Sequence, residues 1–322
     1  MNTDRLQIFA LAETRALGTR VAARLGTTLA GHHERAFEDG EHKVRATEAV
    51  RGADVYLIQS LFADARQSVN DKLLRLLFFL GSLHDAGAAR VTAVLPYLCY
   101  ARKDRRTRWQ DPLSSRYLAQ LLEAVGTDQV VALDVHNLAA FENAFRIPTE
   151  HLSARPLFLE HFRPLLRSQP VTVVSPDAGG AKRAEALRSL MAEAGGHEVG
   201  SAFVEKYRGQ GRVSGQAIVG ELEGRSAIIL DDLVSTGGTL LRAAAACLDA
   251  GATAVHAAAT HLLPTADTDR LLSGGQALHL VVTDSVEADV PVHERMTRLE
   301  TAPLLADAIA RMHLGAAQAA AE

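Results

Sequence analysis

Two aspartates directly before a glycine-rich turn are the residues whose types and spacing most clearly suggest chemistry. The stretch IILDDLVSTGGTL (228–240) places Asp231 and Asp232 at the end of an aliphatic run. The turn that follows supplies hydroxyl donors and adjacent glycines, namely Ser235, Thr236, Gly237, Gly238 and Thr239. Backbone N–H groups of such a turn converge on one anion, and the helix expected after it adds a favourable dipole. The pattern predicts a site for a phosphorylated, polyhydroxylated ligand.

The two aspartates need a partner other than phosphate, because carboxylates do not bind phosphate directly. Sugar hydroxyls donate hydrogen bonds to carboxylates, and Mg²⁺ accepts carboxylate and phosphate oxygens together. An acidic turn followed by an N-capped helix is the alternative interpretation of the same stretch. The stretch therefore indicates a class of ligand and leaves the reaction open.

Three further stretches in the first half of the chain combine acidic, basic and aromatic residues. An aromatic residue precedes carboxylates around a glycine turn in FEDGEHKVR (37–45). Basic residues follow an apolar run in YARKDRRTR (100–108), and Asp134 and His136 stand two positions apart in LDVHN (133–137). If LDVHN ends a strand, these two side chains lie on one face. Singly, the stretches also fit a surface turn, a solvated basic loop or nucleic-acid patch, and a structural histidine.

Short apolar runs alternate with amphipathic helical patterns along the chain. Helical patterns cover 14–26, 69–87, 114–126 and 239–251, and each ends at a glycine, a common helix stop. This alternation predicts βαβ units and a mainly parallel sheet, in which ligands bind beyond the carboxyl ends of the strands. The runs typical of strands are 6–11, 55–59, 91–97, 130–135, 171–175, 227–230 and 254–260.

A coarse repeat relates the two halves of the sequence. LIQS, a helix and GAARVTAVLPYL in the first half correspond to IILDD, a helix and GATAVHAAATHLL in the second. Generic α/β architecture is the alternative source of this likeness. A true duplication predicts two similar domains, 1–150 and 151–322.

Length, charge and composition limit the classes of protein. The 322 residues, 48% of them hydrophobic, suffice for two domains with their own cores. A formal net charge of −4 argues against a general nucleic-acid-binding protein. We find no signal-peptide pattern and no apolar run near the roughly 20 residues of a membrane span. Cys99 and Cys247 stand in apolar surroundings typical of buried thiols in a reducing compartment. We therefore expect a cytoplasmic protein without nucleic-acid or membrane partners.

The combination of motifs resembles a known family. The D-D-x-x-S-T-G-G-T pattern at 231–239 resembles the phosphoribosyl-diphosphate loop of the type I phosphoribosyltransferase fold. Together with F-x-D-G-E at 37–41, QS…ND at 59–71, P-Y-x-x-Y-A-R-x-D at 96–104 and D-x-H at 134–136, it resembles the ribose-phosphate pyrophosphokinase family. The resemblance implies two tandem phosphoribosyltransferase-like (type I) domains, each a mainly parallel sheet flanked by helices.

The resemblance implies an ATP site built from the first half of the chain. In this family ATP is held between subunits, which implies a homo-oligomer. Phe37 is expected to stack on adenine, Asp39 and Glu41 to accept hydrogen bonds from the nucleoside, and Arg102 and Lys103 to face the triphosphate. Many members have Gln where this chain has Lys103. The implied ATP-binding residues are Phe37, Asp39, Gly40, Glu41, Arg102, Lys103 and Asp104.

The second half carries the implied ribose 5-phosphate site and the mobile cations of catalysis. By resemblance, Asp231 and Asp232 hold the ribose hydroxyls and residues 235–239 hold the 5-phosphate. Lys206 and Arg208 lie in the segment EKYRGQGRVSG (205–215), expected to be a catalytic lid, where Tyr207 departs from the usual basic residue. The implied metal residues are His136 and Asp177, with Mg²⁺ as the cofactor.

The resemblance implies transfer of the diphosphoryl group of ATP to the C1 hydroxyl of ribose 5-phosphate. The product is 5-phosphoribose 1-diphosphate (PRPP), with AMP released. Two alternatives remain open, namely a transferase that consumes PRPP and a non-catalytic relative. The first has no use for the stretches 37–41 and 102–104, and the second is expected to lack the lid or the phosphate loop. Ser235 stands where many members have Asp.

Overall fold

The computed structural model divides into two compact units. The first unit contains residues 1–153, 285–287 and 300–322, and the second contains 154–284 and 288–299. The predicted division at residue 150 differs from this, because it assigned all of 151–322 to the second domain. The structure describes residues 5–209, 212–264, 271–272, 278–287 and 293–319, with side chains omitted at 206–209, 212–217 and 316–319.

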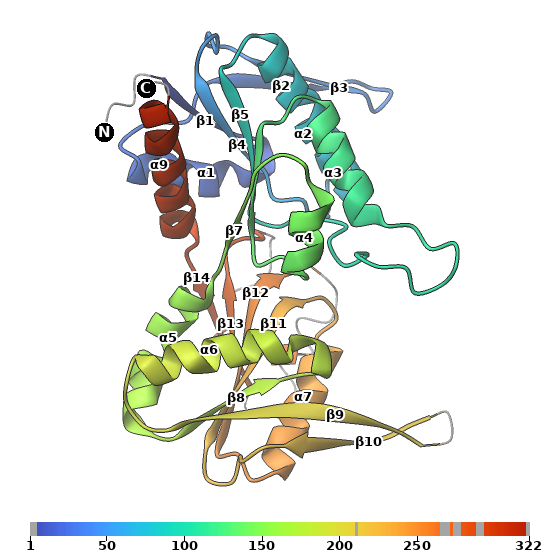
Figure 1. Ribbon diagram of the computed structural model, residues 1–322, viewed down its shortest axis with the longest axis vertical. Coiled ribbons are helices and arrows are strands. Elements are labelled where there is room, and N and C mark those ends of the chain that lie inside the picture. The colour runs from blue at the N-terminus through green and yellow to red at the C-terminus, as the bar shows by residue number, and fades with distance from the viewer. Residues whose placement is uncertain (1–4, 210–211, 265–270, 273–277, 288–292, 320–322) are drawn as a thin grey trace. The chain divides into compact units, whose positions relative to one another are not determined.

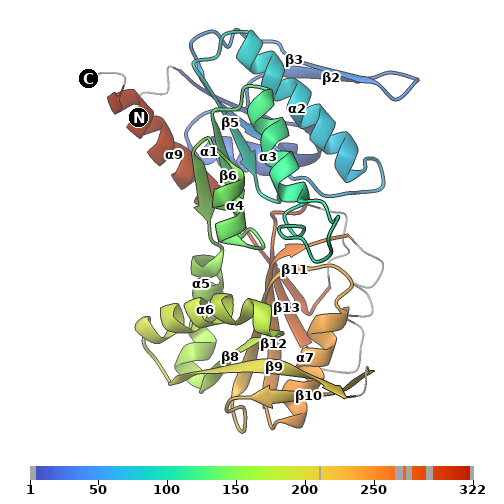
Figure 2. The ribbon, with the colours of Figure 1, turned by 45° about the vertical axis from the view of Figure 1, so that its right-hand side comes forward.

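A five-stranded, fully parallel sheet forms the centre of the first unit, in the order β1-β4-β5-β6-β7 (Figure 1). Its strands are β1 (Leu6–Ala10), β4 (Asp54–Ile58), β5 (Arg90–Leu95), β6 (Gln129–Leu133) and β7 (Thr149–Leu152). The helices are α1 (Arg15–Arg24), α2 (Val69–Asp85), α3 (Ser114–Ala124), α4 (Leu138–Ala144) and α9 (Ala302–Ala319). In both views α2 and α3 lie on one face of this sheet and α1 and α9 on the other (Figures 1 and 2).

A separate antiparallel hairpin, β2 (His32–Ala36) and β3 (His42–Ala46), extends from the first unit and packs against α2. The segment has no apolar run, because most of its positions are exposed or half-buried. Only Val44 of this hairpin is buried within the strands. Ring stacking of His42 on Phe78, with centroids 5.4 Å apart, adds to its attachment.

The C-terminal helix α9 belongs to the first unit because its end joins a charged network on that sheet. Arg90 donates to both carboxylate oxygens of Asp54, at 2.8 and 2.7 Å, and to the carbonyl of Met312. His313 Nδ1 lies 2.7 Å from the same Asp54 carboxylate. These contacts join residues more than 200 positions apart, so no local pattern could have assigned α9 to the first unit.

A seven-stranded sheet forms the second unit, in the order β10-β9-β8-β11-β12-β13-β14. It is parallel except for the antiparallel pair of β9 (Val199–Gly209) with β10 (Arg212–Val219). The other strands are β8 (Val171–Ser175), β11 (Ser226–Val234), β12 (Ala254–Leu262), β13 (Leu278–Thr283) and β14 (Met296–Leu299). In both views α5 (Arg155–Ser168) and α6 (Ala181–Glu193) lie on one face and α7 (Gly238–Asp249) on the other.

The predicted alternation of strands and helices is confirmed. All seven predicted strands and all four predicted helices are present, and the two large sheets are mainly parallel with helices on both faces. The four glycines predicted to end helices, Gly26, Gly87, Gly126 and Gly251, all adopt positive φ, between 72° and 87°. Glycine reaches this conformation without the steric cost of a β-carbon.

Both units have continuous apolar cores against the sheets. Cys99 and Cys247 are buried and free, as expected, and burial raises the pKa of each thiol to about 12. None of the helices in the described ranges combines the length and apolar character that a membrane crossing requires.

Candidate active site

The two aspartates of the phosphate-loop motif lie within strand β11 rather than beyond it. The strand continues to Val234 and pairs with β12 through Asp231 opposite Ala259 and Val234 opposite Leu262. The turn is therefore limited to residues 235–237, and α7 begins at Gly238. This arrangement places the carboxylates on a strand that is paired on both sides, and α7 begins four residues after its end.

Gly237 is the residue of this turn that no other residue type can replace without strain. It is the N-cap of α7 and has φ +73°, a left-handed conformation that is costly for other residues. A β-carbon at this position would also lie 2.9 Å from Leu271 Cδ1. At Gly238, in contrast, a β-carbon would lie 3.3 Å from the end of the flexible Arg242 side chain and at an ordinary 3.8 Å from Thr236 Oγ1. The two adjacent glycines therefore have different reasons to be there.

Asp231 and Asp232 form a closely spaced acidic pair in contact with a cation that the sequence did not indicate. Arg183 Nη1 lies 3.4 Å from Asp231 Oδ1 and 3.1 Å from Asp232 Oδ1. The main-chain N–H of Asp232 donates to Asp231 Oδ1 at 2.8 Å. Burial, followed by the hydrogen bond and charge of Asp232, raises the pKa of Asp231, while Arg183 opposes the shift.

A second arginine missed at the sequence level lies beside the phosphate loop. Arg242, in α7, donates from Nη2 to Thr239 Oγ1 at 3.3 Å. Its position one turn into the helix brings an exposed positive charge close to the helix N-terminus, where an anion would bind. The signal in the sequence was its spacing of three residues from Thr239 on a helical pattern.

In the first unit, three predicted motifs follow three neighbouring strands and contact one another. The QS…ND segment follows β4, the Y-A-R-x-D segment follows β5, and the D-x-H segment follows β6. The Tyr100 hydroxyl contacts Asn70 Oδ1, and Asn137 Nδ2 donates to Asp104 Oδ2 at 2.6 Å. The structure thus brings these motifs together at the carboxyl ends of parallel strands, where α/β folds bind ligands.

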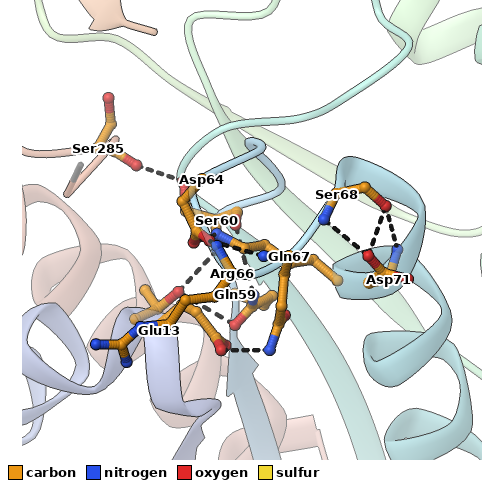
Figure 3. A network of polar contacts seen from close by, with 11 residues as sticks. Glu13, Gln59, Ser60, Asp64, Arg66, Gln67, Ser68, Asp71 and Ser285 are labelled. Atoms are coloured by element: carbon orange, nitrogen blue, oxygen red, sulfur yellow. Dashed lines mark hydrogen bonds and ion pairs between the residues drawn. The ribbon is translucent and has the colours of Figure 1, made fainter. Parts of the chain in front are cut away.

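The QS…ND segment is held by a network of polar contacts (Figure 3). Asp64 Oδ1 accepts hydrogen bonds from the main-chain N–H groups of Arg66 and Gln67, at 2.7 and 2.9 Å. Ser68 and Asp71 form a reciprocal capping box that starts α2. The Ser60 hydroxyl donates to the carbonyl of Ser285, which is part of the same unit. The segment is thus fixed by its own polar groups and by its contact with Ser285.

Lys103 forms an ion pair with Asp111 of its own loop. Its Nζ lies 2.6 Å from Asp111 Oδ2, an oxygen that also accepts from the main-chain N–H groups of Thr107 and Arg108. The hydrogen bond from Lys103 holds the pKa of Asp111 well below its usual range. Arg102, by contrast, is exposed. Of the two cations predicted to face the triphosphate, Lys103 has its charge balanced by Asp111.

The F-x-D-G-E segment forms the turn between β2 and β3. Phe37 N donates to the carbonyl of Glu41 at 2.8 Å, and Gly40 has φ +92°. Asp39 Oδ1 accepts from the main-chain N–H of Glu41 at 3.0 Å, so this carboxylate helps to shape the turn. Phe37 is 39% exposed, and the guanidinium of Arg35 lies 4.8 Å from its ring centroid. The ring is thus presented at the surface on a supported hairpin.

The prediction that Asp134 and His136 share one face of a strand is wrong. Strand β6 ends at Leu133, and Asp134 has φ +39°, which takes the chain out of the extended conformation. The D-x-H segment is therefore a loop that leads into α4, whose N-cap is Asn137. His136 is exposed in that loop.

Comparison with known proteins identifies the family. The family model described as the N-terminal domain of ribose phosphate pyrophosphokinase matches residues 6–126. The model described as the phosphoribosyl synthetase-associated domain matches residues 212–320. Ribose-phosphate pyrophosphokinase 1 of Lactococcus lactis subsp. lactis (strain IL1403) is 34% identical over 317 residues, which cover 97% of this chain and 94% of the relative.

The chain belongs to the ribose-phosphate pyrophosphokinase family. The ribose-phosphate pyrophosphokinase of Caldanaerobacter subterraneus subsp. tengcongensis is 35% identical over 97% of this chain and 96% of its own. A crystal structure of phosphoribosylpyrophosphate synthetase from Mycobacterium smegmatis matches with a TM-score of 0.87 and 31% identity, covering 97% of this chain and 99% of the other. The chain is an enzyme of the ribose-phosphate pyrophosphokinase family with the predicted two-domain, phosphoribosyltransferase-like fold.

The two residues that the family resemblance suggests for Mg²⁺ lie in separate units. In the second unit, Asp177 Oδ1 accepts from the N–H groups of Gly179 and Gly180, at 2.9 and 3.1 Å, which orients the carboxylate. Within the described ranges, no group of three or more His, Cys, Asp or Glu side chains is placed to hold a metal ion. A single oriented carboxylate such as Asp177 fits the mode in which a protein supplies one or two carboxylates to Mg²⁺ and phosphate and water supply the rest.

The predicted lid corresponds to the antiparallel pair β9–β10. Lys206 pairs with Gln216 and Arg208 with Val213, and the register shifts between Val213 and Gly215. The side chains of Lys206 and Arg208 lie outside what the structure describes, as do residues 210 and 211. Their catalytic roles therefore stay predictions.

Proposed function

We propose that this enzyme transfers the diphosphoryl group of ATP to the C1 hydroxyl of ribose 5-phosphate. The observation that carries the proposal is the pair Asp231–Asp232 on β11, followed by a positive-φ glycine at the start of α7, in a chain of this family. The carboxylates suit ribose hydroxyls, and the helix N-terminus with Ser235, Thr236 and Thr239 suits the 5-phosphate.

The proposed chemistry requires no covalent intermediate with the protein. The C1 oxygen attacks the β-phosphorus of ATP, the bond from that phosphorus to the α–β bridging oxygen breaks, and AMP leaves. The hydroxyl proton is released to solvent or to a nearby base. The protein's tasks are to align the oxygen with the phosphorus and to stabilise charge on the diphosphoryl group. We assign the second task to Lys206 and Arg208.

Mg²⁺ is the cofactor we propose, with His136 and Asp177 as its protein contacts. When bound, Mg²⁺ would neutralise charge on the phosphate oxygens of ATP. In the first unit, Phe37 would bind adenine through its exposed ring, with Asp39, Gly40 and Glu41 shaping the nucleoside site. Arg102 would contact the triphosphate, while Lys103 and Asp104 hold the loop.

We also propose that the enzyme is a homo-oligomer in which ATP binds at a subunit interface. The helices α2 and α3 expose large apolar side chains, with Phe78 56%, Tyr117 49% and Leu121 48% exposed. Such side chains are typical of surfaces that become covered by a partner. Sedimentation analysis at several protein concentrations tests the proposal, and a monomer at all concentrations would contradict it.

The experiment that tests the function is an assay of AMP release. Purified protein with Mg²⁺ and ATP should release AMP and form PRPP only when ribose 5-phosphate is present. A transferase that consumes PRPP would release no AMP and would instead release diphosphate from PRPP and a base. A non-catalytic relative would bind the ligands without turnover. Either result would overturn the proposal.

A further inference from the structure

Arg183 occupies a position that local helix preferences do not explain. It lies in the first turn of α6, directly after Lys182, and no acidic residue balances the two in that turn. Cations near a helix N-terminus are unfavourable because the helix dipole is positive there. A residue that breaks a local rule is expected to have a compensating contact elsewhere in the fold.

The compensating contact is the acidic pair of the ribose site. A single nitrogen, Arg183 Nη1, lies within 3.4 Å of one Oδ1 atom from each of Asp231 and Asp232. The Arg183 side chain is 22% exposed and that of Asp232 only 5%. Because β8 and β11 are neighbouring parallel strands, the helix that follows β8 begins beside the end of β11.

Gly180 allows α6 to begin this close to the strands. A β-carbon at Gly180 would lie 2.8 Å from Ser175 Oγ, which itself donates to the Asp177 carbonyl. The same β-carbon would lie 3.9 Å from Arg183 Nη1. The tight approach of this turn thus sets where the guanidinium meets the two carboxylates.

The nearby cation favours the charged forms of the two carboxylates, which burial and their mutual repulsion disfavour. Asp232 is 4% exposed as a residue, and adjacent like charges in a poorly hydrated site disfavour each other. The charged groups that act on Asp231 are Asp232 beside it on β11 and Arg183 on α6. Asp231 keeps 22% of its side chain exposed, so a ligand can reach it while the contact with Arg183 persists.

We propose that Arg183 is a positioning residue for ribose recognition, which orients the Asp231 and Asp232 carboxylates and favours their charged forms, so that they accept hydrogen bonds from the ribose hydroxyls. This role rests on the proposed function. Arg183 acts through the two aspartates and takes no part in the transfer step. Its loss should therefore weaken binding of ribose 5-phosphate, raise the KM for that substrate, and leave the KM for ATP nearly unchanged.

The test compares Arg183→Met with Arg188→Met in the full-length enzyme. Arg188 lies on the same helix and is 28% exposed, but its guanidinium bonds to Glu185 at 2.7 to 2.9 Å. Calorimetric titration with ribose 5-phosphate at pH 6 to 9 should show binding to Arg183→Met weakened by about tenfold or more at pH 7. Binding to Arg188→Met should match the wild type.

The pH profile separates positioning from a merely structural role. Removing the positive charge favours the protonated form of Asp231. As pH is lowered, Arg183→Met should therefore lose its affinity for ribose 5-phosphate at a higher pH than the wild type does. Titration of the substrate's own phosphate is the same for all variants and cancels in this comparison. Arg183→Lys keeps the charge and should restore part of the affinity and most of the profile. If thermal unfolding shows that Arg183→Met does not fold, Arg183→Lys is tested in its place. It should bind ribose 5-phosphate more weakly than the wild type, by a smaller factor than expected for Arg183→Met.

Three results would overturn the proposal. Equal affinities and pH profiles for Arg183→Met and Arg188→Met would show that the aspartates need no positioning. Tighter binding by Arg183→Met would show that Arg183 competes with the ligand. A wild-type enzyme that does not bind ribose 5-phosphate would remove the proposed function and this role together, and is recognised because all variants then fail alike.

Discussion

The acidic residues of the two units are held in different ways. In the first unit, Asp39, Asp104 and Asp111 accept hydrogen bonds from N–H groups of nearby loops or, for Asp111, also from Lys103. In the second unit, Asp231 and Asp232 lie together on a strand against one guanidinium. The contrast indicates that Asp39, Asp104 and Asp111 mainly shape loops, whereas Asp231 and Asp232 form a closely spaced acidic pair whose charged forms one arginine favours.

The largest effect is expected at Lys206 in the second unit. Lys206→Ala should lower turnover by about three orders of magnitude, because it removes a cation expected to stabilise the transferring diphosphoryl group. Binding of ribose 5-phosphate, measured by calorimetry, should stay nearly intact and serves as the internal control. Equal turnover in the mutant and the wild type would remove Lys206 from the mechanism.

The two glycines of the phosphate loop should separate turn geometry from ligand approach. Gly237→Ala combines an unfavourable positive φ with a clash against Leu271, so we expect about 2 kcal/mol of destabilisation and loss of ribose 5-phosphate binding. Gly238→Ala should leave thermal unfolding nearly unchanged. Equal loss of stability in both variants would contradict the distinction.

Asp231→Asn in the second unit should stabilise the ligand-free protein at high pH. Burial and Asp232 raise the pKa of Asp231 from an ordinary 3.8 to about 7. Between these values the folded protein holds a proton that the unfolded chain releases, so this group's contribution to stability falls as pH rises. We expect Asp231→Asn to raise the free energy of unfolding by about 2 kcal/mol at pH 8, with little change at pH 4, and to abolish binding of ribose 5-phosphate.

Asp111→Asn in the first unit should change the free energy of unfolding in the opposite direction. The pKa of Asp111 is lowered, chiefly by the hydrogen bond from Lys103, so its contribution is present at neutral pH and lost as pH falls below its ordinary range. Denaturant unfolding of Asp111→Asn should show lower stability than the wild type at pH 8 and a difference that shrinks near pH 3. If both Asp231→Asn and Asp111→Asn changed the free energy of unfolding at pH 8 in the same direction, the proposed difference between the two acidic sites would be wrong.

The smallest effect is expected at Lys103. Because Asp111 balances its charge, Lys103→Gln should raise the KM for ATP by only about threefold or less, whereas Arg102→Gln should raise it by about tenfold or more. Steady-state kinetics at saturating ribose 5-phosphate measure both values. A larger effect at Lys103 than at Arg102 would show that the ammonium leaves Asp111 to bind the triphosphate.

Much of the fold could be predicted because its signals are local. A continuous apolar run such as 171–175 is typical of a strand buried on both faces, and β8 matches it residue for residue. Strands β2, β3, β7 and β14 were missed because their half-buried or exposed positions give no apolar run. Strand β13 was missed although five of its six residues are buried. Asp134 was misplaced because its positive φ, which is uncommon for a residue other than glycine, ends the strand earlier than the apolar run indicates.

By itself, the sequence determined the α/β architecture, the helix ends at glycines and the phosphate-loop motif, which depend on residues close together in the chain. It also determined the family, which depends on several such motifs in a fixed order. Only the tertiary structure decided that α9 joins the first unit, that Asn137 holds Asp104, and that Arg183 faces Asp231 and Asp232. These contacts join residues 33 to 259 positions apart. Their partners are chosen by strand order and by the direction in which each helix leaves its strand, which no short stretch of sequence specifies.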